Sequence, residues 1–195
     1  MERSKPVQHN ITLEKYGGRI RPARLEDAAF LVRLRNSPHA LGKLGETSQD
    51  VSVQEAWLEK YFQRENDYYF IVERIRDGRS VGACSFYNIQ DGVAEWGRWV
   101  IEPRVPAASI SMWLSFHAAF DLLNLQTLRF LVAEDNIRTL SIFKRIEAAR
   151  IGIDPTPRVI RSRSVRLEEL HIRRAEWPKV SAQLEAKASM DEKLL

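Results

Sequence analysis

The amino-acid sequence predicts an α/β fold in which a mixed, mostly antiparallel sheet carries helices on both of its faces. Two observations lead to this prediction. Asp-Gly pairs at 77–78 and 91–92 separate three β-rich segments, and such pairs between strands are typical of tight hairpin turns. Further along the chain, an apolar helical segment is followed by an apolar strand, which predicts a strand–helix–strand unit with a right-handed crossover. A meander that continues into one parallel crossover forms a mixed sheet.

The first half of the chain is expected to start with a polar arm over residues 1–15, followed by a short strand over 19–21. A helix is expected over 25–36, because acidic side chains in its first turn stabilise the positive end of the helix dipole. The spacing of Ser52–Glu55 predicts a capping box at the start of a second helix. The linker between these helices, residues 37–51, contains proline and glycine and is expected to be a mobile loop.

The second half is expected to contain the strands 68–74, 80–89, 93–101 and 126–133, and the helices 107–123 and 136–149. The first of these helices should end near Asn124, a residue that tolerates the left-handed conformation. The arginine-rich segment 158–174 should supply two closing strands. Residues 179–195 are expected to form a polar tail, with a helix as its candidate secondary structure. The expected organisation is therefore an arm over 1–15, a domain over 16–178 and a tail over 179–195.

The composition is that of a folded globular chain. Its 195 residues, 44% of them hydrophobic and 29% charged, suffice for one domain with a core. The single cysteine, Cys84, excludes an intrachain disulfide and a multi-cysteine metal site, and its apolar surroundings predict inert packing. The net charge of +4 suits an anionic cofactor or substrate as well as nucleic acid, and does not decide between them.

The sequence carries no signal for secretion or membrane insertion. Residues 1–10 are polar and lack the apolar core of a signal peptide. No stretch reaches the ~18 consecutive apolar residues that a membrane span requires. We therefore expect a cytoplasmic protein with no membrane partner.

The segment Ala94–Ser109 carries the strongest chemical signal. A strand ends at Pro103, and a long apolar helix begins after a short turn. The start of a helix has unpaired N–H groups and the positive end of the dipole, so it can receive a phosphate or pyrophosphate group. Glu95 lies on the strand that leads to this turn. A carboxylate beside an anion-binding turn points to an enzyme that uses a phosphorylated cofactor.

The order of the elements and the residues on them resemble the GNAT superfamily of acetyl-CoA-dependent N-acetyltransferases over residues 19–177. The motifs that carry the resemblance are Ile20-Arg21-Pro22-Ala23 with Glu26-Asp27, Leu34-Arg35-Asn36, Ser52–Leu58, Asp67-Tyr68-Tyr69, Asn124–Leu128, Asn136–Ser141 and Leu170–Trp177. Several of them are similar to a branch that includes acetyltransferases of nucleotide-linked amino sugars and of ribosomal-protein N-termini. The resemblance implies a sheet with a central splay that admits the cofactor arm.

The resemblance also implies an activity: transfer of an acetyl group from acetyl-CoA to a primary amine. The first candidates for the amine are a nucleotide-linked amino sugar or another small amine, and a ribosomal-protein N-terminus is the near alternative. The cofactor-binding residues that it implies are Val100, Ile101, Arg104, Ala107, Ala108, Ser109 and Asn136. Backbone N–H groups at Val100 or Ile101 would meet the thioester carbonyl, and Asn136 would bond the cofactor arm, cap the following helix, or do both.

The candidate catalytic residues are Glu95, Asn136 and Ser141. Glu95 is placed to take the proton of the amine, directly or through water. The alternative is a strand carboxylate paired with Arg98 or another arginine, and the sequence favours neither. Ser141 and its neighbour Thr139 could each relay a proton through water, or be ordinary polar residues of a helix.

The chain departs from the family pattern at three places. The cofactor loop of the family reads Q/R-x-x-G-x-G/A, whereas Ala107 and Ser109 stand here in place of the glycines. Glu147 begins the pair that replaces the usual Gly-Phe, and Phe143 stands where many members have a tyrosine acid. These departures leave open a different class of function, a GNAT-fold protein without catalysis that acts as a binding subunit.

Other residues have more ordinary expectations. His117 lies on an apolar helix face without ligand partners, so we expect a packed histidine and no metal site. Trp96 and Trp99 should lie on opposite faces of their strand, because side chains alternate with period two. Gly97 is a candidate bulge at the splay. The arginines of 158–166 form either a solvated strand face or a site for an acidic substrate. No RNA-binding signature accompanies them, so nucleic acid is not an expected partner, and a homodimer remains open.

Overall fold

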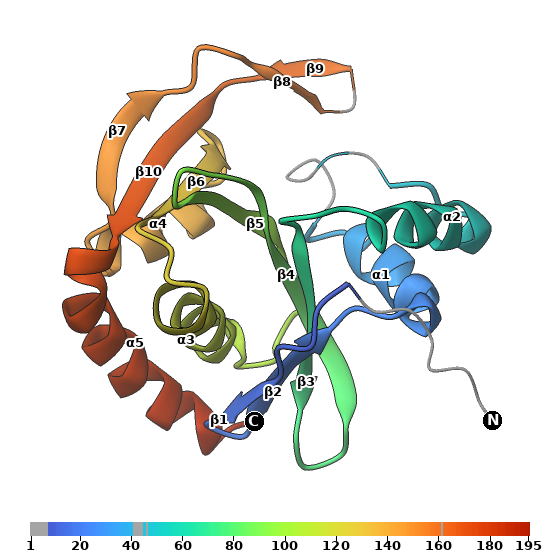
Figure 1. Cartoon of the computed structure of the whole chain (residues 1–195), viewed down its shortest axis with the longest axis horizontal. Helices are drawn as coiled ribbons and strands as arrows, with labels where there is room; N and C mark the ends of the chain where they lie inside the picture. Colours follow the sequence, from blue (N-terminus) through green and yellow to red (C-terminus); the bar gives the residue numbers. More distant parts are fainter. Residues whose placement is uncertain (1–7, 41–44, 46, 161) are drawn as a thin grey trace.

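The computed structural model describes residues 8–40, 45, 47–160 and 162–195, and it contains one eight-stranded sheet with helices on both faces (Figure 1). The strand order is β1-β2-β3-β4-β5-β6-β10-β7. Neighbouring strands are antiparallel except β5 and β6, which run parallel. The mixed, mostly antiparallel α/β class predicted from the sequence is therefore confirmed.

The strands of this sheet are β1 (Leu13–Lys15), β2 (Gly18–Pro22), β3 (Tyr68–Arg74), β4 (Arg79–Gln90), β5 (Val93–Ile101), β6 (Thr127–Ala133), β7 (Ala149–Ile153) and β10 (Leu167–Arg173). The α-helices are α1 (Ala28–Arg35), α2 (Val51–Tyr61), α3 (Ala108–His117), α4 (Ile137–Arg145) and α5 (Trp177–Glu192). The two Asp-Gly pairs lie at the β3–β4 and β4–β5 connections, as expected. At the second one, Asp91 and Gly92 have φ of 50° and 76°, the left-handed values that a two-residue hairpin turn requires.

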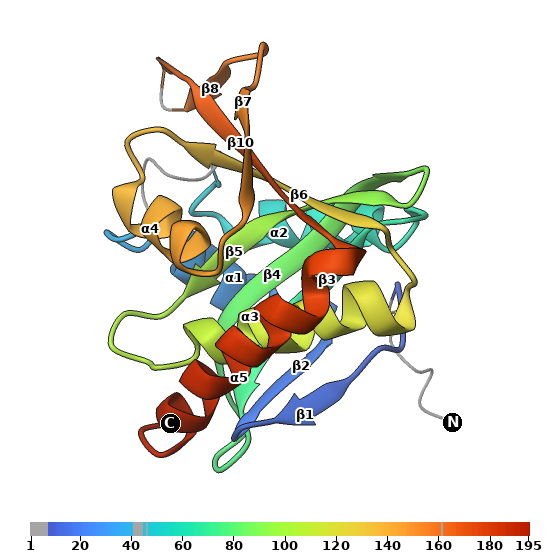
Figure 2. The same ribbon diagram turned by 90° about the vertical axis from the view of Figure 1, so that its left-hand side faces the viewer.

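The sheet separates two layers of helices, which is plain in two perpendicular views (Figures 1 and 2). On one face, α1 and α2 enclose a hydrophobic cluster that includes Leu31, Leu58 and Tyr69. On the other, α3 and α5 enclose a larger cluster that also receives Phe143 of α4 and Trp96 of β5. Burial of these apolar side chains on both faces provides the main stabilisation of the fold.

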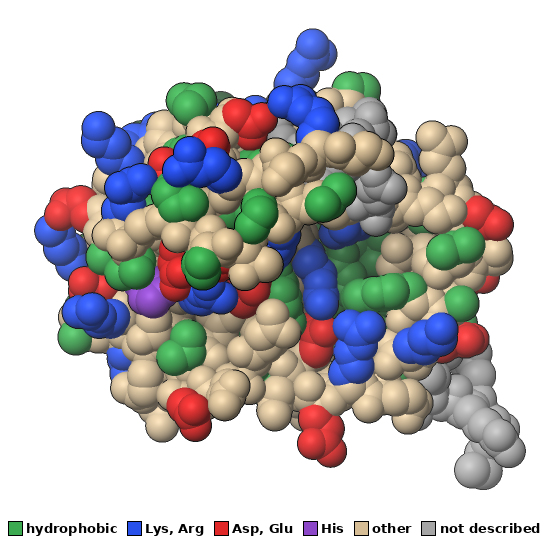
Figure 3. Space-filling view, turned by 90° about the horizontal axis from the view of Figure 1, so that it is seen from above, with side chains coloured by type: hydrophobic (Ala, Val, Ile, Leu, Met, Phe, Trp, Pro, Cys, Tyr) green, Lys and Arg blue, Asp and Glu red, His purple; other side chains and the backbone are tan. Residues whose placement is uncertain are grey.

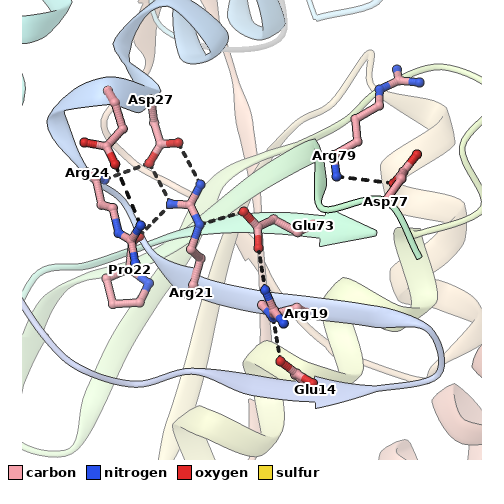
Figure 4. A network of polar contacts seen from close by, with 10 residues as sticks. Glu14, Arg19, Arg21, Pro22, Arg24, Asp27, Glu73, Asp77 and Arg79 are labelled. Carbon is pink, nitrogen blue, oxygen red and sulfur yellow. Dashed lines mark hydrogen bonds and ion pairs between the residues drawn. The ribbon is translucent and has the colours of Figure 1, made fainter. Parts of the chain in front are cut away.

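A largely buried arginine joins the first strands to the start of α1 (Figure 4). The two Nη atoms of Arg21 donate to Asp27 at 2.7 and 2.9 Å, and its Nε donates to Glu73 of β3 at 2.7 Å. Asp27 also accepts the backbone N–H of Arg24 at 2.8 Å. Asp27 and Glu73 are only 5% and 7% exposed, so their hydrogen bonds offset the cost of burying charge. This network fixes how α1 leaves the edge of the sheet.

The N-terminal half differs from expectation in two details. Residues 13–15 of the expected polar arm form β1, which pairs with β2, whereas residues 1–7 lie outside the described part of the chain. Helix α2 is capped by Asp50, whose carboxylate accepts the N–H of Ser52 at 2.9 Å, so the predicted capping box at Ser52 is wrong. The expected loop over 37–51 is described only in part, because residues 41–44 and 46 lie outside the described residues.

The central helix starts and ends slightly differently from the prediction. Ala107 is the N-cap of α3, so the helix begins at Ala108, one residue later than predicted. After His117 the helix continues as a π-helical turn, η2 (Ala118–Leu122), and Asn124 then adopts φ of 54°, as expected for its stop.

The C-terminal part contains more structure than the sequence indicated. The segment 158–174 forms three strands, of which β8 (Arg158–Ile160) and β9 (Arg163–Val165) make a separate hairpin and β10 joins the main sheet. Strand β7 was not expected at all. Residues 179–195 belong mostly to α5. This helix packs along α3 through Val180, Leu184 and Ala188, so the segment is part of the packed domain and not the expected polar tail. Their spacing of four residues places them on one helix face.

Candidate functional site

The parallel strands β5 and β6 separate in the middle of the sheet. Their pairing in the described sheet covers Val93–Glu95 against Thr127–Arg129 and stops there. Beyond this point a cavity of about 400 Å³ lies between the two strands. Its walls include Tyr87, Trp96, Trp99, Phe130, Phe143 and Arg158. The sheet therefore has the central splay that the family resemblance implied, and the cavity lies within it.

A bulge in β5 determines which side chains face this cavity. Ala83 pairs with Val100 and Ser85 pairs with Gly97, so β5 has one more residue than β4 between these pairs. The extra residue is accommodated at Arg98, whose φ is 50°. The bulge predicted at Gly97 therefore lies one residue further along. Gly97 has a different role, because a Cβ atom there would lie 2.5 Å from the hydroxyl oxygen of Tyr87.

The bulge also overturns the prediction that Trp96 and Trp99 lie on opposite faces. Their ring centroids are 5.2 Å apart on the same side of the strand. Trp96 Nε1 donates to Ser115 Oγ and Trp99 Nε1 donates to Ser111 Oγ, each at 3.1 Å, so both indoles are held by α3. One extra residue reverses the alternation of side chains, which is why the period-two rule fails here.

Glu95 lies behind the wall of the cavity, next to its lining residue Trp96, and is only 4% exposed. Its carboxylate accepts the Tyr87 hydroxyl at 2.6 Å, an Nη atom of Arg158 at 2.8 Å and Nδ2 of Asn88 at 3.3 Å. Burial and the negative charge of Glu95 raise the pKa of Tyr87. Glu95 is therefore ion-paired, but with Arg158 of the β8–β9 hairpin. It reaches the cavity through Tyr87 and Arg158, which line the wall.

Arg98, the other partner considered for Glu95, binds elsewhere. Its two Nη atoms donate to the carboxylate of Asp67 at 2.6 and 3.0 Å.

A second, smaller cavity of about 150 Å³ lies where β5 ends and α3 begins. Five of the expected cofactor residues line it: Val100, Ile101, Arg104, Ala108 and Asn136. Trp99, Asn136 and Thr139 line both cavities. The two cavities therefore adjoin one another between the start of α3 and the splay. The N-cap of α3 is Ala107, which offers no side-chain acceptor to the N–H groups of the first turn.

The direction of the β5 backbone distinguishes Val100 from Ile101. The N–H of Glu102 donates to Val81 of β4 at 2.8 Å. Because successive N–H groups of a strand point to opposite edges, the N–H of Val100 shares that edge and the N–H of Ile101 faces the open edge. On this open edge, the carbonyl of Ile101 contacts Nε2 of His39 at 3.0 Å. Ile101 is thus the better placed of the two for a thioester carbonyl.

Two expected cofactor residues do not present their side chains to this cavity. Ala107 is 1% exposed in the core, and Ser109 donates its hydroxyl to Asp191 of α5 at 2.5 Å. The Ser109 side chain therefore holds α5, since it lies on the face of α3 that packs against that helix.

On α4, the geometry favours Thr139 over Ser141. Asn136 is the N-cap and accepts the N–H of Thr139 at 3.4 Å. Ser141 is exposed and donates to the carbonyl of Arg138 at 2.9 Å. At about 100° per residue, positions 136, 139 and 143 share a helix face and position 141 does not. This corrects the sequence interpretation, which placed Ser141 in the site. Phe143 lies on the shared face. The centroid of its ring is 4.4 Å from that of Phe130.

Sequence reasoning missed several residues of the site. Tyr87 lies opposite Glu95 in the β4–β5 pairing, and Arg158 comes from the hairpin. A third cavity, of about 300 Å³, adjoins the splay and is lined by Arg35, Arg64 and Arg98. The motif Leu34-Arg35-Asn36 marked Arg35 in the sequence, but nothing local indicated that these arginines converge.

Two other residues considered in the sequence, His117 and Cys84, have packing roles. His117 contacts Asp121 at 2.7 Å and stacks on Trp113 at 5.0 Å, as a satisfied histidine would. Cys84 is fully buried, and burial raises its pKa to about 12, which confirms inert packing. Within the described residues, no helix has the length and apolar character needed to span a membrane.

Comparisons with known proteins agree with this architecture. Residues 19–148 match the family described as "Acetyltransferase (GNAT) domain". No match was found among curated protein sequences. Among solved structures, a GCN5-related N-acetyltransferase from Brucella melitensis superimposes with a TM-score of 0.79 and 21% identity, over 93% of this chain and 87% of the other.

Two further solved structures are similar. A protein described as "Apo FdhC- a nucleotide-linked sugar GNAT" has a TM-score of 0.76 and 23% identity, over 91% of this chain and 98% of the other. A mutant of a spermidine N-acetyltransferase from Vibrio cholerae has a TM-score of 0.72 and 17% identity, over 84% and 97%. At these identities the similarity concerns the fold.

Proposed function

The chain belongs to the acetyltransferase (GNAT) domain family, and from this premise we propose that it transfers an acetyl group from acetyl-CoA to a primary amine. The observation that carries the proposal is the pair of adjoining cavities at the start of α3 and in the splay between β5 and β6. A long, thin co-substrate with a pyrophosphate at one end and a thioester at the other suits a groove with this course.

The start of α3 provides the proposed pyrophosphate site. Its uncapped N–H groups and the positive end of the helix dipole attract phosphate oxygens, although Ala107 and Ser109 replace the glycines of the family pattern. Arg104 follows the end of β5 with φ of 65° and lines the same cavity. We assign the N–H of Ile101 to the thioester carbonyl, and Asn136 to the arm that connects the two ends.

In the proposed reaction, the amine nitrogen bonds to the acetyl carbon, the bond from that carbon to sulfur breaks, and CoA leaves as a thiolate. Glu95 receives the amine proton through Tyr87 or a water molecule, because its carboxylate is buried behind Tyr87. Phe143 cannot donate a proton to sulfur. A thiol pKa of ~8.5 lets the thiolate leave near neutral pH with little help, so the missing tyrosine slows the reaction without stopping it.

The first candidate acceptor is a nucleotide-linked amino sugar. The similarity to a protein described as a nucleotide-linked sugar GNAT supports this choice, as does the basic wall beside the splay. The acceptor would enter from the side of α1 and α2, opposite the co-substrate groove.

The proposal is tested by release of free thiol when the protein is mixed with acetyl-CoA and a panel of nucleotide-linked amino sugars, small amines and peptide N-termini. We expect thiol release with at least one sugar nucleotide. Ala108→Asp places a negative charge in the first turn of α3, which the helix dipole tolerates but a pyrophosphate does not, so CoA binding should be lost. Ala108→Asn is the neutral control of similar size.

Binding of CoA without acetylation of any panel member would contradict the proposed enzyme activity and favour the alternative of a binding subunit. Equal affinity for CoA in Ala108→Asp and in Ala108→Asn would contradict a pyrophosphate site at the start of α3.

A further inference from the structure

The third cavity has a strongly basic wall and lies at the acceptor end of the site. Arg35 of α1, Arg64 after α2 and Arg98 of β5 line it, and its described lining contains no acidic residue. Arg35 and Arg98 also line the cavity of the splay, so the two cavities adjoin one another. Seen from this side, the surface is hollowed near its centre, with basic side chains beside hydrophobic ones (Figure 3).

The positive charge of this wall is only partly balanced by the described residues. Asp67 takes both Nη atoms of Arg98, and the same carboxylate lies 3.4 Å from Arg64. Arg35 donates to the Thr47 hydroxyl at 2.6 Å and to the carbonyl of Gly45 at 3.3 Å, which are neutral acceptors. One carboxylate thus faces three guanidinium groups among these residues. Such an excess attracts anions and repels cations.

Aromatic rings hold two of the guanidinium groups in place. Trp57 of α2 lies under Arg64 and Arg98, with ring-to-Cζ distances of 5.1 and 5.2 Å. Arg98 also lies 4.3 Å from the ring of Tyr87. A guanidinium stacked on a ring keeps its N–H donors in the plane of the group, where they can bind an anion in bidentate fashion. Of these two groups, Arg98 is already bound to Asp67, so Arg64 is the ring-held group available to an anion, and its fixed position lowers the entropy cost of binding.

We propose that Arg35 and Arg64 form an anion subsite that holds an acidic group of the acceptor, so that the acceptor carries a phosphate or carboxylate in addition to its amine. This inference rests on the proposed acetyl transfer. With the anion held against α1 and α2, the amine end extends past Arg98 into the splay, where Glu95 and Tyr87 lie. Polyamines are excluded as acceptors, because they would bring only positive charge to this wall.

The subsite is tested by calorimetric titration of inorganic pyrophosphate and, in a second arm, malonate into protein saturated with CoA, so that the start of α3 is already filled. We expect binding that weakens with salt. Arg35→Gln and Arg64→Gln should each lower the affinity about tenfold, because each removes a charge-assisted pair of donors. Arg33→Gln is the matched control, since Arg33 is exposed on α1 and lies over Phe30, outside the cavity.

Two comparisons interpret the result. Tighter binding of pyrophosphate assigns the subsite to phosphate, and tighter binding of malonate assigns it to carboxylate. The side chain of Arg64 is 43% exposed, so Arg64→Gln should fold even if loss of the Arg35 contacts disturbs the adjoining loop.

Equal affinity of all three variants would overturn the subsite, and so would faster acetylation of spermidine than of acidic amines. Failure of the proposed function appears differently, as absent CoA binding or absent thiol release with every amine. In that case the same titrations without CoA would still measure the effect of Arg35 and Arg64.

Discussion

Glu95 of β5 and Arg158 of β8 form an ion pair with an N–O distance of 2.8 Å beside the cavity of the splay. The Glu95 side chain is 5% exposed and that of Arg158 is 47% exposed, so the hairpin reaches over the cavity to contact a buried carboxylate. Tyr87 holds the other side of the same carboxylate oxygen. The candidate base is thus oriented by two residues that also line the cavity.

Glu95→Gln should lower kcat, and the loss should be greatest at low pH, where the substrate amine is mostly protonated. Loss of a general base costs ~10²–10⁴-fold in rate. The measurement is thiol release as a function of pH. Glu185→Gln, which removes an exposed partner of Lys15 far from the cavity, is the control. Turnover equal to that of the unchanged protein from about pH 6 to about pH 9 would leave Glu95 only a structural ion-pair partner.

Gly97→Ala should destabilise the protein by about 1–3 kcal/mol, because the new Cβ atom would lie 2.5 Å from the Tyr87 hydroxyl oxygen. Denaturant unfolding measures the change. In the double variant Gly97→Ala, Tyr87→Phe the closest contact is removed, so the combined loss should be smaller than the sum of the two single losses. If the losses of unfolding free energy in the two single variants simply added up in the double variant, the Tyr87 hydroxyl would not be what disfavours a larger side chain at position 97.

Ser109→Ala should lower the free energy of unfolding by about 1–3 kcal/mol and leave CoA affinity unchanged. The hydroxyl donates to Asp191, which is 5% exposed and would lose a hydrogen-bond donor. Denaturant unfolding and CoA titration on the same variant separate the two effects. A large loss of CoA affinity without loss of stability would return Ser109 to the cofactor site.

His9 should make stability depend on pH. Burial lowers its pKa to about 4 from the usual 6.5, although the hydrogen bond with the Tyr69 carbonyl and the negative charge of Asp67 oppose the shift. The folded state therefore keeps His9 neutral, and the unfolded state binds a proton first as pH falls. The contribution of neutral His9 to the free energy of unfolding is complete above about pH 6.5. It is lost progressively as the pH falls towards about 4.

His9→Phe retains the aromatic contacts with Tyr68 and Phe70 and removes this titration. Unfolding free energies measured between these pH values should then fall less steeply than in the unchanged protein. Identical slopes would mean that His9 does not contribute to the pH dependence.

Local sequence patterns were sufficient for most of the elements. The bounds 68–74 and 93–101 agree with β3 and β5, because alternating apolar residues and Asp-Gly turns act over a few residues. The helix start near Ala108 follows from the same kind of signal. Strand β7 was missed because Ala149–Ile153 has only five residues, one of them Gly152, and glycine weakens the signal of a strand.

Register between strands was not predictable to the accuracy that the site requires. A regular two-residue hairpin at Asp91–Gly92 would place Asn88 opposite Glu95. The pairing shifts between Tyr87 and Gln90, and Asn88 adopts φ of 53°, so Tyr87 takes that position. A shift of one residue exchanges the faces of the side chains, and such shifts depend on packing by neighbouring elements.

The sequence by itself determined the α/β class, the order of most strands and helices, and the turn that precedes α3, since hydrophobic periodicity, turn residues and helix ends are local properties. Tertiary structure alone decided that Arg158 reaches Glu95, that Trp96 and Trp99 share a face, and that Ser109 holds α5. These contacts join residues far apart in the chain or depend on a bulge. Their formation is set by the combined packing of the sheet and its helices, which no local pattern encodes.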